Sequence, residues 1–300
     1  MYLIRIFADF LRPEEIKPIF DDRFSTQFIS NYGEDKDIYI TDKDDYTHAI
    51  IINTAMPDIK TDIAKENVLG LAYEPHFGRP FLNITPQFIE YAEKYIGKYF
   101  IGDLYGLSAP FIETPSYLTY SVPSWKITDK TINSIIQQKS KKISIMISEK
   151  TVAPGHLYRE KLVNAILKTD LPIDIYGRGC WRFNSSNNND SRLKGTFQDN
   201  EPYLDYKFHI SIENFQSNNY FSEKVLNPLM YGTIPIYLGC HNIDKFLPEK
   251  SIIHLTYEID EDIKMLRDII ENNHNHWRLI EVEKIENSMN LFKNIDKVFN

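Results

Sequence analysis

The run of residues 206–248 constrains the fold of this chain most strongly, because two buried-type strands flank a short helical segment there. The strands are expected at residues 207–212 and 234–238, and the helical segment at 225–231 stops at Gly232. A strand, a helix and a second strand in this order form the repeating unit of parallel α/β sheets. We therefore expect an α/β fold.

Strands and helices alternate over the rest of the chain as well. In the first half, strands are expected at 2–7, 38–40, 49–53, 68–72 and 99–101, and helices at 13–20 and 86–98. In the second half, further strands are expected at 143–147, 173–176 and 252–255, with helices at 126–142, 157–168 and beyond 261. Residues 107–123 and 181–200 are expected to be irregular loops. The pattern predicts two α/β units, residues 1–135 and 136–300.

Polar residues follow the strand at 207–212. Glu213 and Asn214 come at its carboxyl end, where parallel sheets bind small molecules near helix N-termini. Ser222 is a plausible cap for a helix that begins at Glu223, and the free N–H groups there would favour a phosphate. Lys224 would add a mobile positive charge, and Glu223 could accept two hydroxyl hydrogen bonds, as from a ribose.

These groups suit a nucleoside diphosphate joined to a sugar, but a blander interpretation of them is equally open. A Glu-Lys pair in a first helical turn is often a solvated surface pair, and Asn after a strand is often a turn residue. Spacing alone does not separate the two interpretations.

The same run resembles the donor-binding motif of the α1,3/4-fucosyltransferases, glycosyltransferase family 10. The matching segments are, in order, Tyr206-Lys207-Phe208, Glu213-Asn214, Tyr220-Phe221-Ser222-Glu223-Lys224 and Ile234-Pro235-Ile236-Tyr237-Leu238-Gly239. Order and spacing are kept here. A looser similarity extends over residues 140–257, and the N-terminal half matches only in short pieces.

The resemblance implies a GT-B-like fold, in which two Rossmann-like α/β domains face a cleft. It implies an inverting enzyme that moves L-fucose from GDP-fucose to a hydroxyl of a glycan acceptor, as α1,3-type fucosyltransferases do. Residues 1–135 would form the acceptor-side domain and 136–300 the donor-binding domain, with 275–300 packing back on the first. The partners would be a nucleotide-sugar donor and an oligosaccharide acceptor.

Two rival functions stay open at this point. One is a transferase of the same fold that uses another GDP-deoxysugar. The other is a catalytically silent protein that binds a glycan or a nucleotide.

Glu74 is the candidate general base, because inverting transfer needs a carboxylate beside the acceptor hydroxyl. It follows the strand expected at 68–72 and precedes Pro75, and family members carry a similar strand-end Glu-x-Pro. The spacing differs by one residue here, so a turn carboxylate is an equal alternative. His76 and Asp103 are further candidates.

The partner of the diphosphate is less clear on the first turn of the helix near 157. Family members place an Arg at the start of that helix, whereas His156 stands nearest that position here and Arg159 lies one turn later. Both could face a phosphate, and either could simply be solvated. Arg178, in a Tyr-Gly-Arg strand end similar to that of the family, is a lesser candidate for phosphate or base contact. Asn214 and Tyr220 would shape the donor pocket.

Composition excludes several classes of protein. A formal net charge of −8 without a long basic run argues against general binding of nucleic acid. Two cysteines, Cys180 and Cys240, make no disulfide framework and indicate a reducing compartment. Asp42-Lys43-Asp44-Asp45 has the letters of a metal-binding Asp-x-Asp element, but a solvated loop is the better interpretation. We expect no obligatory metal or cofactor, and the resemblance implies GDP-fucose as the donor substrate.

The N-terminal residues 1–11 are too short and too polar for a signal sequence or a spanning helix. No later segment has the apolar length that a spanning helix needs. The sequence thus predicts a cytoplasmic protein, and a bacterial or viral source would fit.

Overall fold

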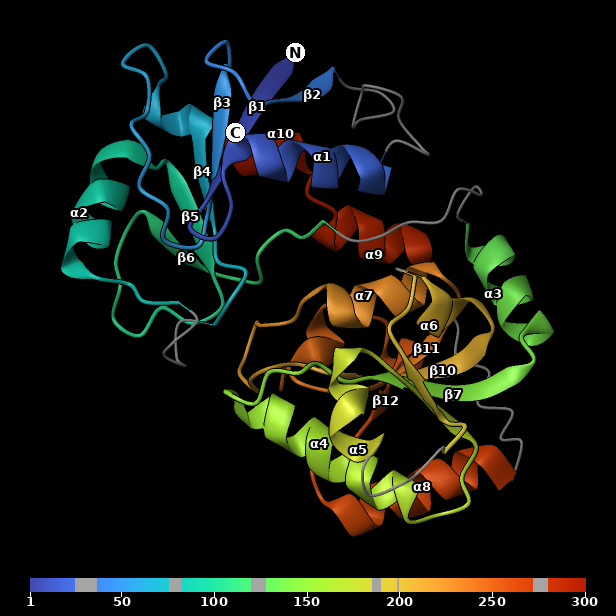
Figure 1. The fold of residues 1–300 in the computed structure, drawn as a ribbon. Coiled ribbons are helices and arrows are strands. Elements are labelled where there is room, and N and C mark those ends of the chain that lie inside the picture. Colours follow the sequence, from blue (N-terminus) through green and yellow to red (C-terminus); the bar gives the residue numbers. More distant parts are fainter. Residues whose placement is uncertain (25–36, 76–81, 120–127, 185–189, 199, 272–279) are drawn as a thin grey trace. The chain divides into compact units, whose positions relative to one another are not determined.

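The computed structural model describes residues 1–300 except 25–36, 76–81, 120–127, 185–189, 199 and 272–279 (Figure 1). Contacts divide the chain into two compact units. Unit 1 comprises Met1–Ser124, Ser217–Glu223 and Ile285–Asn300, and unit 2 comprises Trp125–Gln216 and Lys224–Lys284. Each unit is built on one sheet of six parallel strands within the described residues.

The sheet of unit 1 has the order β2-β1-β3-β4-β5-β6. Its strands are β1 (Tyr2–Ala8), β2 (Ile38–Thr41), β3 (His48–Ile52), β4 (Val68–Leu71), β5 (Lys98–Ile101) and β6 (Phe111–Glu113). The helices of this unit are α1 (Pro13–Phe24), α2 (Pro86–Tyr95) and α10 (Ile295–Phe299). The first five strands lie where the sequence predicts strands. The short edge strand β6 lies in a segment expected to be an irregular loop, and its pairing with β5 is a tertiary contact that local sequence does not encode.

Both faces of this sheet are buried, as expected for parallel strands. Successive residues of β3 alternate between two apolar clusters, because side chains along a strand point to opposite faces. Ile50 and Ile52 belong to one cluster, together with residues of α1 and α10, whereas Ala49 and Ile51 belong to the other. Figure 1 shows α1 and α10 covering one face of the sheet and α2 covering the other.

Unit 2 contains a second parallel sheet, of order β12-β11-β10-β7-β8-β9. Its strands are β7 (Lys141–Met146), β8 (Ile173–Tyr176), β9 (Leu193–Gly195), β10 (Tyr206–Ile212), β11 (Ile234–Leu238) and β12 (Ile253–His254). The helices are α3 (Asp129–Gln138), α4 (Pro154–Leu167), α5 (Trp181–Asn184), α6 (Glu201–Leu204), α7 (Glu223–Met230) and α8 (Ile259–Glu271), and α9 (Val282–Met289) leads into unit 1. The segment 181–200, expected to be a loop, contains α5 and β9.

No helix in the described part of the chain is long and apolar enough to cross a membrane. Cys180 and Cys240 are both buried free thiols.

The two six-stranded parallel sheets confirm the predicted α/β fold with two parallel-sheet domains. The roles assigned to the two domains stay predictions.

Candidate active site

Topology marks one edge of the unit 2 sheet as a ligand site. The chain leaves β7 towards β8 and β9 on one side, whereas β10, β11 and β12 follow on the other. This strand order is that of dinucleotide-binding folds, which bind ligands outside the carboxyl ends of the two central strands where the order reverses. In this unit the two central strands are β7 and β10. Glu213 and Asn214 directly follow β10, and α4, which contains His156 and Arg159, is the helix that follows β7.

The first turn of α4 is packed directly against the end of β10. The backbone N–H of Gly155 donates to the carbonyl oxygen of Asn214 at 2.9 Å. A Cβ atom on Gly155 would lie 1.8 Å from the carbonyl oxygen of Glu213, closer than any real contact. Only glycine therefore lets the start of α4 reach the predicted donor residues.

Arg159, in the second turn of α4, binds the end of β10. It is 6% exposed, and its Nη2 atom donates to the carbonyl oxygen of Ile212 at 2.8 Å and to Oδ1 of Asn214 at 3.3 Å. The guanidinium thus orients the Asn214 amide and places a positive charge at the end of β10.

His156 reports a positive electrostatic environment at the same place. Its Nδ1 atom accepts a hydrogen bond from the backbone N–H of Ala153 at 3.2 Å. Burial lowers the pKa of His156 to about 4, and the further cause is positive charge on Arg159, Lys150, Lys224 and Arg182. The imidazole is therefore neutral at pH 7, and the positive charges near it are those that would stabilise an anion. Of the two candidates for the phosphate, Arg159 carries the charge.

Lys224 lies beside a buried carboxylate. Its Nζ atom is 3.6 Å from Oε2 of Glu213, whose side chain is fully buried. The carbonyl oxygen of Lys224 accepts a hydrogen bond from Ser211 Oγ at 2.8 Å, which ties the first turn of α7 to β10. The structure thus brings together five of the predicted site residues, namely His156, Arg159, Glu213, Asn214 and Lys224.

The end of β8 contributes a second group of residues. Arg178 has an exposed side chain 3.5 Å from the Glu149 carboxylate. Arg182, which the sequence reasoning missed, donates to the carbonyl oxygens of Ser148 and Glu149 at 2.8 Å each. Arg182 holds the turn after β7 in place. No sequence signal marks it, because it lies in a polar segment that reads as a loop.

The remaining predicted residues belong to unit 1. Glu74 follows β4, and the hydroxyl of Tyr220 donates to its Oε2 atom at 3.5 Å. Asn219 anchors the same loop through its Nδ2 atom, which donates to the carbonyl oxygen of Gly102 at 2.9 Å. Ser222 and Glu223 line a pocket of unit 1. Contacts thus divide the predicted motif between the two units after Glu223.

Asp103, one of the two alternatives for the base, and the Asp42–Asp45 element can be located as well. Asp103 accepts a hydrogen bond from the hydroxyl of Tyr105 at 3.3 Å, and His76 lies outside the described residues. In the Asp42–Asp45 element, Asp44 pairs with Arg5, and Asp45 accepts from Thr41 Oγ1 at 2.9 Å. Among the residues that the structure describes, no group of three or more His, Cys, Asp or Glu side chains is arranged to hold a metal ion.

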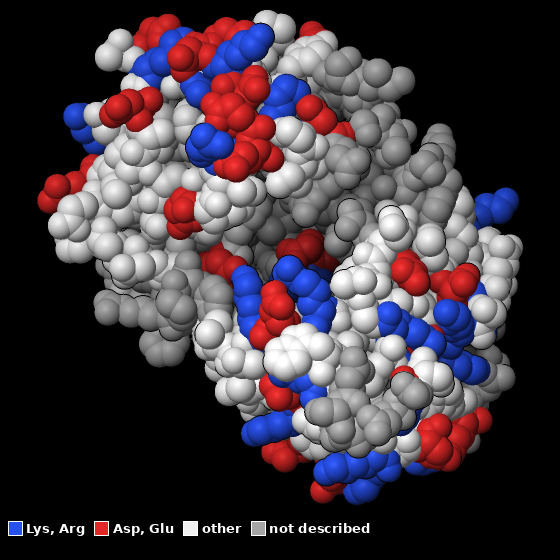
Figure 2. All heavy atoms as spheres, viewed as in Figure 1, with Lys and Arg blue, Asp and Glu red and all other residues white. Residues whose placement is uncertain are grey.

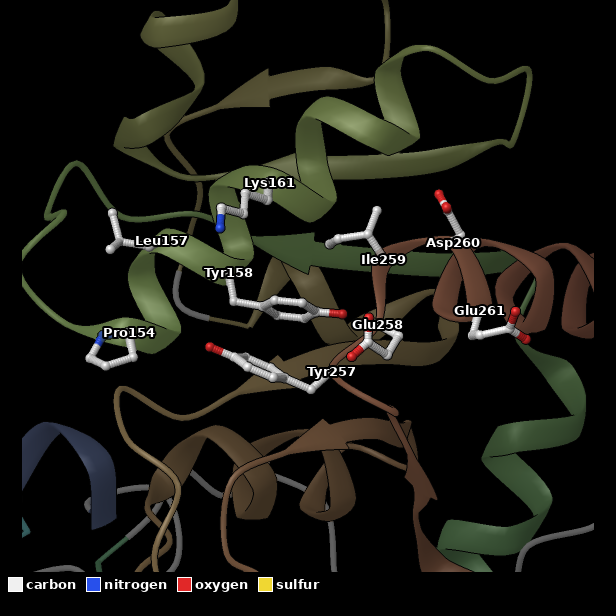
Figure 3. Close-up of a pocket in the computed structure, with 9 residues that line it drawn as sticks. All are labelled: Pro154, Leu157, Tyr158, Lys161, Tyr257, Glu258, Ile259, Asp260 and Glu261. Atoms are coloured by element: carbon white, nitrogen blue, oxygen red, sulfur yellow. The ribbon is translucent and has the colours of Figure 1, made fainter.

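A larger cavity of about 620 Å³ lies elsewhere on unit 2 (Figure 3). Leu157, Tyr158 and Lys161 line it from α4, and the ring of Tyr257 packs against that of Tyr158 at a tilt of 32°, with centroids 4.6 Å apart. Helical periodicity puts Leu157 and Lys161 on the side of α4 opposite to Arg159, with Tyr158 on the flank between them. This cavity is therefore separate from the site at the end of β10.

Acidic and basic side chains are interspersed on the face in Figure 2. Among the described residues of that face, Lys and Arg form no continuous surface. This distribution is unlike the extended basic stripe of a nucleic-acid-binding protein.

Comparison with protein families gives one match over half of the chain. The family described as glycosyltransferase family 10 (fucosyltransferase), C-terminal part, matches residues 136–286. The alpha-(1,3)-fucosyltransferase B of Drosophila melanogaster is 37% identical over 102 residues, which cover 31% of this chain and 21% of that protein. The alpha-(1,3)-fucosyltransferase FucT of Helicobacter pylori is 27% identical over 164 residues, which cover 46% and 33%. The chain thus spans a third or less of the length of these relatives.

Solved structures share the fold. An alpha1,3-fucosyltransferase with GDP-fucose superposes with a TM-score of 0.52 at 16% identity, over 92% of this chain and 80% of that one. The Anabaena protein Alr3699/HepE, in complex with UDP and glucose, gives a TM-score of 0.52 at 9% identity, over 84% and 77%. These likenesses confirm the predicted GT-B-like fold. Because the two proteins hold different nucleotides, the fold alone does not select the donor.

Proposed function

The chain belongs to glycosyltransferase family 10 (fucosyltransferase), and we propose that it transfers L-fucose from GDP-fucose to a hydroxyl of a glycan acceptor, with inversion. The observation that carries the donor half of this proposal is that Arg159 and Lys224 both lie at the carboxyl end of β10, where the first turn of α4 packs. A diphosphate is the kind of ligand that such a site stabilises. The choice of fucose as the transferred sugar is supported by the relatives, which are named fucosyltransferases.

In this proposal Lys224 and Arg159 stabilise the diphosphate electrostatically, and the positive end of the α4 helix dipole adds to their charge. His156 contributes a neutral ring. Asn214, oriented by Arg159, shapes the donor pocket together with Glu213.

The other donor roles rest on the family motif. Glu223 would accept the ribose hydroxyls, Ser222 would begin its helix, and Tyr220 would complete the pocket. Arg178, which is exposed at the end of β8, would contact the base or a phosphate.

Glu74 is proposed as the general base. Its carboxylate would take the proton of the acceptor hydroxyl as that oxygen bonds to C1 of fucose, while the bond from C1 to the diphosphate oxygen breaks on the opposite face. The nucleoside diphosphate leaves with the electron pair of that bond, and its negative charge is what the cations of unit 2 would stabilise. The hydrogen bond from Tyr220 supports this role, because it restricts the orientation of the carboxylate.

Calorimetric titration with GDP and with UDP tests the donor class first. We expect GDP to bind and UDP not to bind. Binding of neither nucleotide would contradict the proposal.

Glu74→Gln tests the base. We expect turnover to fall by about 100-fold or more, the usual contribution of a general base, with GDP affinity unchanged. Glu66→Gln is the control, because Glu66 is an exposed glutamate of the same unit. Turnover that survives Glu74→Gln would move the role to Asp103 or His76.

A panel of GDP-deoxysugars separates the rival functions. Transfer of another deoxysugar in preference to fucose would identify a different donor. GDP binding without transfer of any sugar would indicate a silent binding protein.

The cytoplasmic location predicted from the sequence remains a proposal.

A further inference from the structure

The sheet of unit 1 has a reversal point of its own. Its strand order places β1 between β2 and β3, so the chain leaves β1 in one direction and continues from β3 in the other. In flavodoxin-like sheets of this order, ligands bind outside the carboxyl ends of these two strands. Asp9 follows β1 and Asn53 follows β3 in this unit.

A network of hydrogen-bonded polar side chains lies at these strand ends. The Nδ2 atom of Asn53 donates to Oδ1 of Asp9 at 3.2 Å, and the hydroxyl of Thr54 donates to Oδ2 of Asp9 at 3.0 Å. Asn53 is buried with φ of 54°, and its Oδ1 atom accepts from the backbone N–H of Tyr73 at 3.0 Å. The three strand ends β1, β3 and β4 are thereby held together.

An apolar pocket of about 250 Å³ lies at the same strand ends. Phe10 and Leu11 line it after β1, Ile52 lines it from the end of β3, and Ile16 and Ile19 line it from α1. Its volume exceeds the roughly 150 Å³ of an engineered apolar cavity that holds benzene, so a ring or a short alkyl chain would fit. Among the described residues that line the pocket, eight of eleven are aliphatic or aromatic, and Thr119, Ser222 and Glu223 are the polar ones.

This pocket adjoins the candidate base through two segments. Tyr73 lines it and directly precedes Glu74. Ser222 and Glu223 line it from the loop whose Tyr220 donates to the Glu74 carboxylate. A group attached to a sugar at Glu74 could therefore reach the pocket.

We propose that this pocket binds an apolar substituent of the acceptor, an alkyl or aryl group attached to the sugar that receives fucose. The inference rests on the proposed function, because it takes the acceptor to be the molecule at Glu74. It adds a specificity that the proposed reaction does not require, since the chemistry involves only the sugar hydroxyl.

Methyl and hexyl β-lactosides test the pocket with one sugar and two apolar groups. We expect the hexyl compound to have a KM about tenfold lower than the methyl compound at similar kcat. The reason is that the hexyl group contacts the protein equally in the ground state and in the transition state. Tenfold corresponds to about 1.4 kcal/mol, the burial of roughly two methylene groups. Saturation-transfer NMR should show contact between the protein and the hexyl chain independently of turnover.

Ile19→Glu should remove both the KM difference and the NMR contact by placing a charge in the pocket. Ile112→Glu is the matched control, because both isoleucines are 38% exposed and Ile112, on β6, does not line the pocket. The control should keep the preference for the hexyl compound.

The outcomes separate the two proposals. Equal KM values for both lactosides in the wild-type protein would overturn the pocket assignment and leave fucosyl transfer intact. If no lactoside is fucosylated, the NMR contact decides: its loss in Ile19→Glu alone supports the pocket, and its absence from the wild-type protein overturns it.

Discussion

The ion pair between Lys224 and Glu213 offers a quantitative test of the candidate site. The Glu213 side chain is fully buried, the Lys224 side chain is 26% exposed, and the charged atoms are 3.6 Å apart. Lys224→Met removes the positive charge but keeps an apolar stem. It leaves a buried carboxylate without its ammonium neighbour, whereas Glu213→Gln removes the negative charge at nearly constant shape.

The separation sets the size of the effect. Two unit charges 3.6 Å apart interact with about 4 to 5 kcal/mol at an effective dielectric constant of 20. Solvent at the partly exposed ammonium screens some of this energy. We therefore expect Lys224→Met alone to lower the free energy of unfolding by about 3 kcal/mol, and a double-mutant cycle with Glu213→Gln to give a coupling of about 2 kcal/mol.

Urea denaturation of the wild-type protein, both single variants and the double variant measures this coupling. Calorimetry with GDP on the same four proteins separates the structural from the binding role. The double variant should recover stability but not GDP affinity, because it lacks the ammonium proposed to stabilise the diphosphate. An equal recovery of both would show that Lys224 acts only through Glu213.

The exposed pair Lys264 and Glu261 on α8 is the control cycle. Its atoms are 2.7 Å apart, but the side chains are 71% and 59% exposed. Lys264→Met with Glu261→Gln should give little or no coupling, because solvent screens this pair. A coupling for Lys224 and Glu213 no larger than this control would refute the reasoning from burial.

Two further predictions concern the same unit. Burial lowers the pKa of His209 to about 3, with a smaller effect of Arg159. Below pH 6.5, His209 takes up a proton in the unfolded chain but not in the native protein. The free energy of unfolding should therefore fall by about 2 kcal/mol between pH 7 and pH 5 because of this histidine. Urea denaturation at several pH values should show a flatter profile over that range for His209→Gln. Gly155→Ala should cost about 1–3 kcal/mol of stability and weaken GDP binding, because its Cβ atom would displace the start of α4; an unchanged unfolding midpoint would contradict the packing argument.

Much of the fold could be predicted because its signals are local. Buried parallel strands such as β3 and β10 are recognisable from a few consecutive residues, and α2 from its helical periodicity. The short elements β6, α5 and β9 could not be predicted, because three or four residues carry too little periodicity and depend on neighbouring segments for pairing.

The sequence by itself determined the alternating α/β pattern and the motif from Glu213 to Lys224, since both depend on residue types at fixed spacing. Only the tertiary structure decided that Lys224 lies beside a buried carboxylate, that Arg182 holds the turn after β7, and that Tyr220 donates to Glu74. These contacts join residues of different elements, and two of the three join residues more than 30 positions apart. Which distant side chains meet depends on strand order and packing, and no local pattern records either.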